Sequence, residues 1–441
     1  MYKKILENII LPFGDRILKT TFITDLRRWR KLEMQSPAQI KSLQLLTLKG
    51  LLEHASKSNQ YYKSLNIQSN SDPELWLKSF PILTKTTIKS NIEGMIDGDK
   101  NVLVRHLSSG SSGIQGEVYM TKSNESNQQA VQTRWWEWSG YRLGDKIMQT
   151  GMTPTRSKVK AIKDKLFRTR YINAFKSSPQ TLADIAKDLS SGNNYDFIMG
   201  YASSIYGIAD YLKSNNIKSD KLKGVVSWGD KLFPHYRKTL EDVFNCETFD
   251  TYGCSEGFMI AAECQYHKLH IMTPLVYLEI VDDDGNEVKP GQLGKVIVTR
   301  LDNKVMPLIR FYLGDLAVVA PESETCSCDR PYPILERVIG RDTDIVKTKS
   351  GKSMVVHFFT GIFEFYPNIK QFRVIQRDLN GMEIEIIKEN DFNESDLDKI
   401  KTTINNFLEE DFPTAFTYVN EIPATASGKP QIIQSFIVKK F

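Results

Sequence analysis

The sequence predicts an α/β fold in which a large N-terminal domain of layered α/β sheets carries a β-rich subdomain and precedes a small, mobile C-terminal α+β domain. Three observations predict it. Apolar strands alternate with amphipathic helices between about residues 146 and 257. From about residue 274 the pattern changes to strands and tight turns. After a charged, glycine-containing stretch near residue 340, the remaining chain alternates two strands and one helix. We therefore expect domains at 1–339 and 340–441.

Composition narrows the class of protein. The chain has 441 residues, 41% of them hydrophobic and 25% charged, which is ordinary for a globular protein with a large core. The net charge of +5 is spread along the chain, so it does not indicate a nucleic-acid partner. Five cysteines are too few for a disulfide-built scaffold. No apolar run approaches the roughly 18 residues of a membrane span, so we expect a cytoplasmic protein with no transmembrane segment.

The first nineteen residues, MYKKILENIILPFGDRILK, combine basic and apolar residues. Glu7 interrupts the apolar patch and no small-residue cleavage site follows, so we do not expect a signal peptide. Two uses remain open for Ile5, Ile9, Ile10 and Leu11. Packing of an N-terminal helix is the one we favour, and a peripheral membrane contact is the alternative.

The individual elements follow from local patterns. Residues 1–65 read as helices, most clearly 38–57, where Leu and Ile recur at helical spacing. A helix is expected from about Ser123 to Trp138; its three tryptophans are typical of a core face. Strands are expected at 146–152, 195–201, 221–228 and 247–253, with helices at 202–215 and 234–244 between them. In the second half we expect strands at 276–281, 294–301, 371–376 and 382–387 and a helix at 395–412.

Several polar loops rich in glycine follow predicted strands. The segment 107–118, LSSGSSGIQGEV, reads as strand, tight loop and strand, and such a loop can direct successive N–H groups and hydroxyls toward a phosphate. For this segment alone we favour a polar hairpin turn, because small Ser/Gly loops are common and the segment lacks the G-x-x-x-x-G-K-[ST] pattern. Loops at strand ends are where α/β sheets bind ligands. The other segments are 227–231, 250–257, 313–315 and, near the C-terminus, 425–430.

Taken together, these segments resemble the motifs of the adenylate-forming superfamily, and most closely the phenylacetate–CoA ligase branch with its capsule-biosynthesis relatives. SSGSSG resembles the phosphate loop, DTYGCSEG the adenine and magnesium motif, and RFYLGDLA the ribose motif. VIGRDTD resembles the interdomain hinge and ASGKP the C-terminal lysine motif. The resemblance implies the fold of that superfamily, ATP and Mg²⁺ as cofactors, and a C-terminal domain that rotates between two half-reactions.

The resemblance also implies residue roles. Lys429 would stabilise charge between carboxylate and α-phosphate, Glu256 would help to hold magnesium, and Ser255 would touch phosphate. Asp315 and Arg341 would contact the ribose. The phosphates would be held by Ser109, Gly110, Ser111, Ser112 and Gly113, and adenine would be surrounded by Gly229, Asp250, Thr251, Tyr252 and Gly253.

These residue types suit the chemistry independently of the resemblance. A carboxylate that attacks a phosphate meets like-charge repulsion, which magnesium and a lysine offset. The sequence departs from the family at three places. Ile114-Gln115-Gly116 replaces T-G-x-P in the phosphate loop, Tyr312-Leu313 replaces a basic residue and threonine before Gly314, and Thr343 stands where the hinge acid is common.

A second group of residues has the composition of a metal site. Cys264 and His270 lie in ECQYHKLH, and Cys326 and Cys328 form a C-x-C pair later in the chain. Three cysteines and one histidine suit a closed tetrahedral structural zinc site. His267 is an alternative ligand, and reduced thiols with no metal are the other interpretation.

The sequence therefore predicts an ATP-dependent, carboxylate-activating ligase whose partners are a small-molecule acid and an acceptor. Coenzyme A is the first choice of acceptor. An amine is the alternative, which would make the protein an amide ligase in capsule or surface polysaccharide biosynthesis. A further alternative is a non-catalytic nucleotide-binding homologue. A dimer is compatible with these predictions, and the acid is left open.

Overall fold

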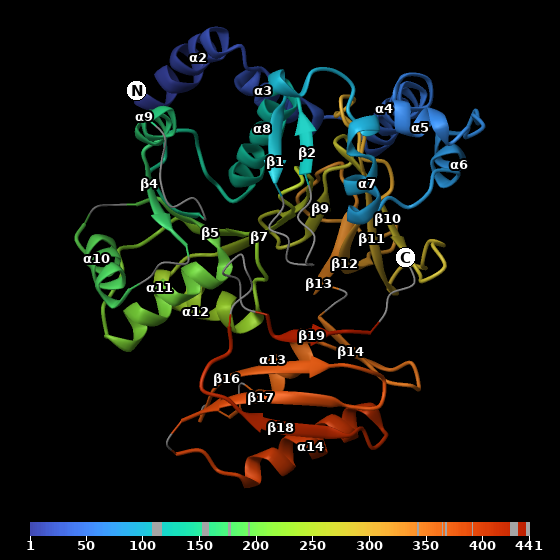
Figure 1. The fold of residues 1–441 in the computed structure, drawn as a ribbon. Helices are drawn as coiled ribbons and strands as arrows, with labels where there is room; N and C mark the ends of the chain where they lie inside the picture. Colours follow the sequence, from blue (N-terminus) through green and yellow to red (C-terminus); the bar gives the residue numbers. More distant parts are fainter. Residues whose placement is uncertain are drawn as a thin grey trace.

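The structure is a computed structural model that describes residues 1–107, 117–151, 158–174, 178–192, 195–341, 344–363, 365–366, 368–389, 391–423 and 431–437. Within these residues there is one large sheet and a smaller C-terminal sheet, which lies below the large one in the view of Figure 1. The mixed α/β architecture predicted from the sequence is confirmed. No helix among the residues described is long and apolar enough to cross a membrane.

The N-terminal segment is helical, as the sequence predicts. The longest helix, α4, begins at Ser36, whose hydroxyl accepts the N–H of Gln39 while the Gln39 side chain accepts the N–H of Ser36. At the start of the chain Leu6 is buried, and Ile10 and Leu11 pack against the core, as expected if the N-terminal helix packs on the domain. The elements are α1 (Tyr2–Ile5), the π-helical turn η1 (Leu6–Ile10), α2 (Leu11–Leu18), α3 (Phe22–Leu32), α4 (Pro37–Ser58), α5 (Gln60–Ser64), α6 (Pro73–Lys78), α7 (Lys85–Met95) and the 3-10 turn η2 (Lys100–Val102).

One half of the large sheet is parallel, with strand order β4-β3-β5-β6-β7. Its inner strands are buried on both faces, which explains their continuous apolar sequence. Helices α11 and α12 lie on the side that faces the C-terminal domain (Figure 1). The elements are β1 (Val104–Leu107) and β2 (Glu117–Met120), which form a separate pair, then α8 (Lys122–Trp138), β3 (Ile147–Gly151), α9 (Lys158–Leu166), β4 (Thr169–Asn173), α10 (Pro179–Leu189), β5 (Phe197–Tyr201), α11 (Ala202–Ser214), β6 (Gly224–Trp228), α12 (Pro234–Phe244) and β7 (Thr248–Gly253).

The other half is antiparallel and continues from β7 in the order β8-β9-β13-β12-β11-β10. The β-rich subdomain predicted from the sequence is therefore joined edge to edge with the parallel half in one eleven-stranded sheet. The three-residue strand β9 makes the junction by pairing with both β8 and β13. The strands are β8 (Met259–Glu263), β9 (Leu269–Ile271), β10 (Val276–Val281), β11 (Leu293–Arg300), β12 (Phe311–Val319) and β13 (Ile334–Arg341).

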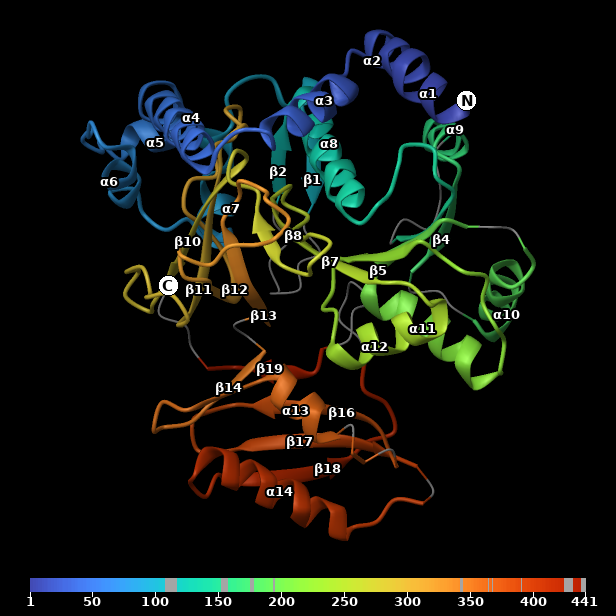
Figure 2. The same cartoon turned by 180° about the vertical axis from the view of Figure 1, so that it is seen from behind.

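The C-terminal domain has a core of its own, built on a four-stranded sheet in the order β18-β17-β16-β19. Helix α14 covers the side of this sheet away from the large domain (Figure 2). Phe233, at the start of α12, belongs to the same apolar cluster, so the two domains share a contact. The elements are β14 (Ile345–Lys347), β15 (Ser353–Val355), α13 (Val356–Phe363), β16 (Ile369–Gln376), β17 (Met382–Lys388), α14 (Ser395–Leu408), β18 (Thr414–Tyr418) and β19 (Ile433–Ser435).

The helix predicted from about Ser123 to Trp138 is present as α8. It is capped by Thr121, whose hydroxyl accepts the N–H of Asn124 while the Asn124 side chain accepts the N–H of Thr121. One local prediction was wrong. The segment 313–315, expected as a loop, lies inside strand β12, where Gly314 has a φ of +78°. The positive φ explains the error, because a glycine that distorts a strand has the same local sequence signal as one in a turn.

A buried arginine ties the two halves of the N-terminal domain together. Arg300 is fully buried; its Nε donates to Asp302 Oδ1 at 2.6 Å and its Nη1 donates to the carbonyl of Gly257 at 2.8 Å. Burial alone would raise the pKa of Asp302, but the Arg300 charge and side-chain hydrogen bonds outweigh it and lower that pKa. The pair therefore stays ionised in the interior, where loss of either partner leaves an unpaired charge.

We expect Arg300→Met to lower the free energy of unfolding by about 3–5 kcal/mol, because the buried Asp302 carboxylate loses its counter-charge. Denaturant unfolding monitored by tryptophan fluorescence measures the loss. The double variant Arg300→Met/Asp302→Asn removes both charges and should recover part of it. Equal midpoints for the wild type and the single variant would contradict this account.

Candidate functional site

A cavity of about 870 Å³ lies between the two domains. Its walls come from the loop after β6 and from strands β7, β12 and β13 on one side, and from C-terminal residues including Asp344, Val356 and Ile432 on the other. The carboxyl ends of β6 and β7 reach this edge of the sheet, the position at which open α/β sheets bind ligands. The cavity is large enough for a nucleotide-sized ligand.

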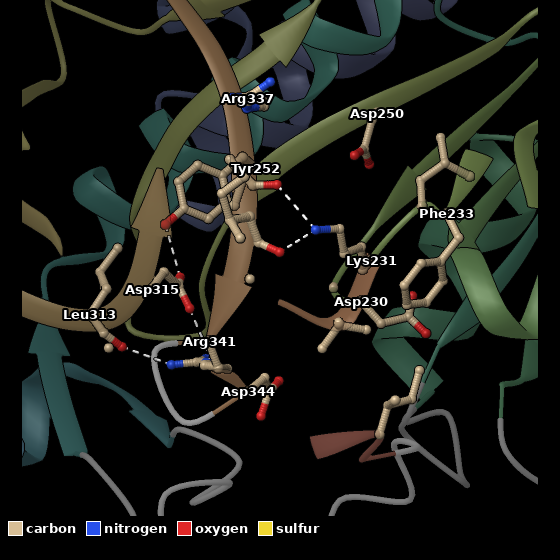
Figure 3. Close-up of a pocket in the computed structure, with 18 of the residues that line it drawn as sticks. Asp230, Lys231, Phe233, Asp250, Tyr252, Leu313, Asp315, Arg337, Arg341 and Asp344 are labelled. Atoms are coloured by element: carbon tan, nitrogen blue, oxygen red, sulfur yellow. Dashed lines mark hydrogen bonds and ion pairs between the residues drawn. The ribbon is translucent and has the colours of Figure 1, made fainter. Parts of the chain in front are cut away.

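One wall is built around the carboxylate of Asp315 (Figure 3). Tyr252 on β7 donates its hydroxyl to Asp315 Oδ2 at 2.8 Å, and Arg341 Nε lies 3.1 Å from Asp315 Oδ1. Arg341 Nη1 also donates to the carbonyl of Leu313 at 2.7 Å. The Asp315 charge is the main reason that the pKa of Arg341 is raised, and burial, reinforced by Asp315, raises the pKa of Tyr252 well above its usual value. The wall therefore presents a carboxylate beside a neutral phenol and a charged guanidinium.

A second carboxylate faces the cavity deeper in the sheet. Asp250 accepts the hydroxyl of Ser227 at 2.6 Å, and its backbone N–H donates to Glu263 at 2.9 Å. Arg237 holds Glu263 with two hydrogen bonds of 2.7 and 2.9 Å. Burial, with the nearby Glu263 charge, raises the pKa of Asp250 to about 7. Asp250 can therefore carry a proton near neutral pH, and its protonated form can donate a hydrogen bond.

Glu256 lies in the turn between β7 and β8 and pairs with a lysine from a distant helix. Its side chain is buried, and Lys85 Nζ, in the first turn of α7, lies 3.1 Å from Glu256 Oε1. Burial alone would raise the pKa of Glu256, but the Lys85 charge and hydrogen bonds outweigh it and lower that pKa. The site therefore keeps a buried carboxylate ionised close to the cavity, which Lys85 itself lines.

The loop after β6 contributes a close backbone approach and a buried lysine. Gly229 has a φ of +83°, and a Cβ at this position would lie 2.5 Å from the ring of Tyr201, so no side chain fits there. Two residues on, Lys231 donates to the backbone carbonyls of Val338 and Ile339 on β13 (Figure 3). Burial lowers the pKa of Lys231 to about 8, against the opposing effect of three nearby aspartates.

Comparisons with known proteins show which proteins this chain is similar to in sequence. Residues 344–435 match the family described as CapK C-terminal domain. The chain is 24% identical to Protein CapK of Staphylococcus aureus over 389 residues, which cover 85% of each chain. It is 26% identical to a phenylacetate-coenzyme A ligase of Pseudomonas putida over 336 residues, which cover 71% of this chain and 73% of that one.

This chain is a homologue of Protein CapK and of phenylacetate-coenzyme A ligases.

Solved structures agree on the fold. A 2-hydroxyisobutyryl-CoA ligase in a postadenylation state, bound to R3-HIB-AMP, superposes with a TM-score of 0.72 at 15% identity and covers 92% of this chain and 91% of its own. The same ligase in a thioesterification state, with 2-HIB-AMP and CoA, gives a TM-score of 0.59 over the same coverage. Both TM-scores are high enough to show the fold.

The structure brings one part of the predicted superfamily site together and does not describe the rest. Gly229, Asp250, Thr251, Tyr252, Gly253, Asp315 and Arg341 all line the cavity. Glu256 lies behind Lys85, and Ser255 is exposed in the turn before it. Ser109, Gly110, Ser111, Ser112, Gly113 and Lys429 lie outside the described residues, as does Thr343.

The four residues of the predicted metal site converge although they come from separate parts of the chain. The ligand atoms of Cys264, His270, Cys326 and Cys328 all lie within 4.8 Å of one another. The sulfurs of Cys264 and Cys326 are 3.6 Å apart, close to the roughly 3.8 Å edge expected of a tetrahedron with Zn–S bonds of 2.3 Å. The alternative ligand His267 lies outside this cluster, against Glu263 and the ring of Phe249.

The surroundings of His270 suit a metal ligand. Its Nδ1 lies 3.0 Å from the carbonyl of Tyr332, so Nδ1 carries the proton and Nε2, 3.1 Å from Cys328 Sγ, keeps its lone pair. Burial lowers the pKa of His270, which favours the neutral ring that binds metals. The donor set therefore fits zinc, which prefers thiolate and imidazole ligands.

Sequence reasoning missed Lys85 and Lys231. Lys85 falls in LTKTTIKSN, which reads as an entry loop and short helix, and nothing in its spacing points to Glu256 far along the chain. Lys231 stands in the loop SWGDKL that follows β6, and a lysine inside such a loop was the available signal. Phe258, Met259 and Ile260, which follow the DTYGCSEG segment, are buried, and Phe258 stacks on Phe311.

We expect Asp250→Asn to remove a pH dependence of stability. Because the pKa of Asp250 is raised from 3.8 to about 7 in the folded protein, its contribution is fully present below pH 3.8 and is lost as pH rises to about 7. The wild type should therefore lose about 4 kcal/mol relative to Asp250→Asn between about pH 4 and about pH 8.

Denaturant midpoints measured across this pH range test the effect. Asp242→Asn, an exposed change on α12, is the matched control and should follow the wild type. Parallel curves for the wild type and Asp250→Asn would show that Asp250 ionises normally in the folded state.

Proposed function

We propose that this chain is an ATP-dependent ligase that joins a carboxylic acid to AMP, releases pyrophosphate, and then passes the acyl group to the thiol of coenzyme A. One observation carries the proposal: residues of the loop after β6 and of strands β7, β12 and β13, far apart in the sequence, meet in one cavity. The similarity to coenzyme A ligases, at 26% identity over 71% of the chain, supports it.

Asp315 has the free hydrogen-bonding capacity that a ribose diol needs. A carboxylate offers about four lone-pair sites, and Tyr252 and Arg341 occupy two of them. The remaining sites can accept the two ribose hydroxyls. In this proposal Arg341 also keeps Asp315 oriented, and Gly229, Thr251, Tyr252 and Gly253 enclose the adenine ring.

Glu256 fits the magnesium ligand. Mg²⁺ usually takes one or two protein carboxylates together with phosphate oxygens, and Glu256 is buried, ionised and adjacent to the cavity. When bound, the ion would neutralise phosphate charge during attack by the acid. Lys85, already paired with Glu256, adds positive charge at the same place. The segment that contains Ser109 to Gly113 would hold the phosphates through its backbone N–H groups and hydroxyls.

A rotating C-terminal domain fits the similarity to two states of one enzyme. The TM-score to the 2-hydroxyisobutyryl-CoA ligase falls from 0.72 in its postadenylation state to 0.59 in its thioesterification state, over equal coverage. The arrangement of this chain is therefore nearer the former. We place the boundary between the domains at 340–344, where β13 leaves the large sheet, and assign Lys429 to the adenylation step.

The amine acceptor is the second candidate, and one observation favours it. The match to Protein CapK extends over 85% of both chains, and the family match to the CapK C-terminal domain covers the part of the chain that would approach the acceptor. With an amine acceptor the product is an amide, and the resemblance to capsule-biosynthesis relatives supports a role in surface polysaccharide assembly. The cytoplasm is the compartment in which ATP would be available for either reaction.

We expect ATP–pyrophosphate exchange that depends on an added acid when the protein is tested against aromatic, aliphatic, amino and uronic acids. Lys429→Ala should slow this exchange about 100-fold or more, because a positive charge is lost where negative charge develops. The same variant should transfer a supplied acyl-adenylate to acceptor at nearly the wild-type rate. Repeating the assay with coenzyme A and with amines distinguishes the two acceptors.

Lys349→Ala is the matched control, since Lys349 is an exposed lysine of the same domain. Exchange that is as fast in Lys429→Ala as in this control would refute the role of Lys429. A flat response to every acid, together with nucleotide binding, would favour the non-catalytic homologue.

We also propose that Cys264, His270, Cys326 and Cys328 hold one structural zinc ion. Protein purified without chelator should contain about one zinc per chain by mass spectrometry, and Cys264→Ser/Cys326→Ser should lose it. Cys246→Ser is the control, because Cys246 lies outside the cluster. Zinc-free wild-type protein would rule out the site.

A further inference from the structure

A surface with an unusual composition lies at the end of the molecule away from the C-terminal domain. Both views place α2 and α9 at this end, and Figure 2 shows α1 beside them. Tyr2 on α1 donates its hydroxyl to the carbonyl of Leu166 at the end of α9, so the two segments are in contact. We call this surface, formed by residues 1–19 and 160–168, the N-terminal face.

The helical segment of the face is anchored on its inner side only. Leu6 is buried in the core, Lys3 pairs with Asp145, and Glu7 pairs with Arg30 at 2.5 Å. Asp15 is also used internally, where it accepts the hydroxyl of Thr20 and the N–H of Ile23. Both acidic residues of this segment therefore have structural partners.

The outer side of the same segment carries an apolar stripe. Ile9, Phe13 and Ile17 follow one another at four-residue spacing and are 63%, 66% and 61% exposed. Residues with this spacing lie on one side of a helix. Leu18 beside them and Ile162 on α9 are also more than half exposed. None of these apolar side chains belongs to a core cluster of the residues that the structure describes.

Exposed basic residues surround the stripe. On the N-terminal segment they are Lys4, Arg16 and Lys19. On and after α9 they are Lys160, Lys163, Lys165 and Arg168, while the single acid of that helix, Asp164, is partly buried. Between the two segments lies a shallow depression of about 530 Å³, lined by Tyr2, Ile162, Lys165, Leu166 and Arg168.

We propose that the N-terminal face docks this protein on an anionic membrane surface, with Ile9, Phe13 and Ile17 entering the interface between headgroups and acyl chains. An interfacial helix combines a large apolar residue stripe with lysine and arginine at its margins. The cores of protein–protein interfaces are instead depleted in lysine, which makes a protein partner the poorer match. The inward use of Glu7 and Asp15 leaves positive charge outside, complementary to anionic lipid.

The position of the face is compatible with turnover on a membrane. The C-terminal domain lies at the other end of the molecule (Figure 2), and none of the residues that line the cavity belongs to the N-terminal face, so docking would leave both free. The proposal does not depend on the ligase reaction, since it rests on surface residues remote from the cavity.

Co-sedimentation of the full chain with lipid vesicles tests the proposal. We expect binding to vesicles in which half of the phosphatidylcholine is replaced by phosphatidylglycerol, weak binding to phosphatidylcholine alone, and loss of binding as salt increases. Each basic residue near an anionic surface is worth about five-fold in affinity, so Lys4→Glu/Arg16→Glu/Lys19→Glu should weaken binding about 100-fold or more. Phe13→Ser/Ile17→Ser should weaken it about 10-fold or more.

Matched exposed changes elsewhere serve as controls. The triple variant Lys89→Glu/Lys187→Glu/Lys213→Glu changes the net charge by the same amount as the face variant. The double variant Leu46→Ser/Phe365→Ser removes exposed apolar side chains of similar size. Phe13→Leu should keep most of the binding. Wild-type protein that fails to sediment with anionic vesicles, or equal binding by the face variants and their controls, would overturn the proposal. Loss of self-association in the face variants without any vesicle binding would show that the face meets a second copy of the chain.

Discussion

The carboxylate of Asp315 is the point on which the site depends. It lies on β12, and its two partners come from two other strands: the Arg341 guanidinium from the neighbouring strand β13 and the Tyr252 hydroxyl from β7. A buried carboxylate is stable only if donors and charges of this kind compensate for its lost hydration. The register that pairs Asp315 with Arg341, the last residue of β13, therefore fixes the geometry of the cavity wall.

The rest of the cavity continues the same balance of charges. Acidic groups in and beside the cavity are Asp250, Asp315, Asp344 and Glu256, and the basic groups near them are Lys85, Lys231 and Arg341. The charges do not compensate fully. Burial, with the Glu263 charge, raises the pKa of Asp250, and burial lowers the pKa of Lys231 in spite of the nearby aspartates. Groups poised near neutral pH are common where a site must accept a highly charged ligand.

The sequence was a good guide wherever the signal is local. The spacing of Leu and Ile predicted α4 to within one or two residues, and Pro234 marked the first turn of α12. It could not show that the two halves form one sheet, because the junction is the three-residue strand β9, too short for a periodic pattern. The pairing of Lys85 with Glu256 was equally invisible, since it depends on where a helix packs. For the cavity, the resemblance to known motifs identified Asp315, Tyr252 and Arg341, whereas residue spacing alone did not relate them.

Strand β13 links two features that are distant in space. At its first residue, Ile334 pairs with His270 of the cysteine–histidine cluster; at its last, Arg341 holds Asp315. Eight residues of strand span about 25 Å. Loss of the proposed zinc, or oxidation of its cysteines, would remove the support at one end of this strand, and the resulting displacement would extend along the strand to Arg341 and the Asp315 wall of the cavity. The metal and redox state of the cluster would thereby affect the shape of a cavity about 25 Å away.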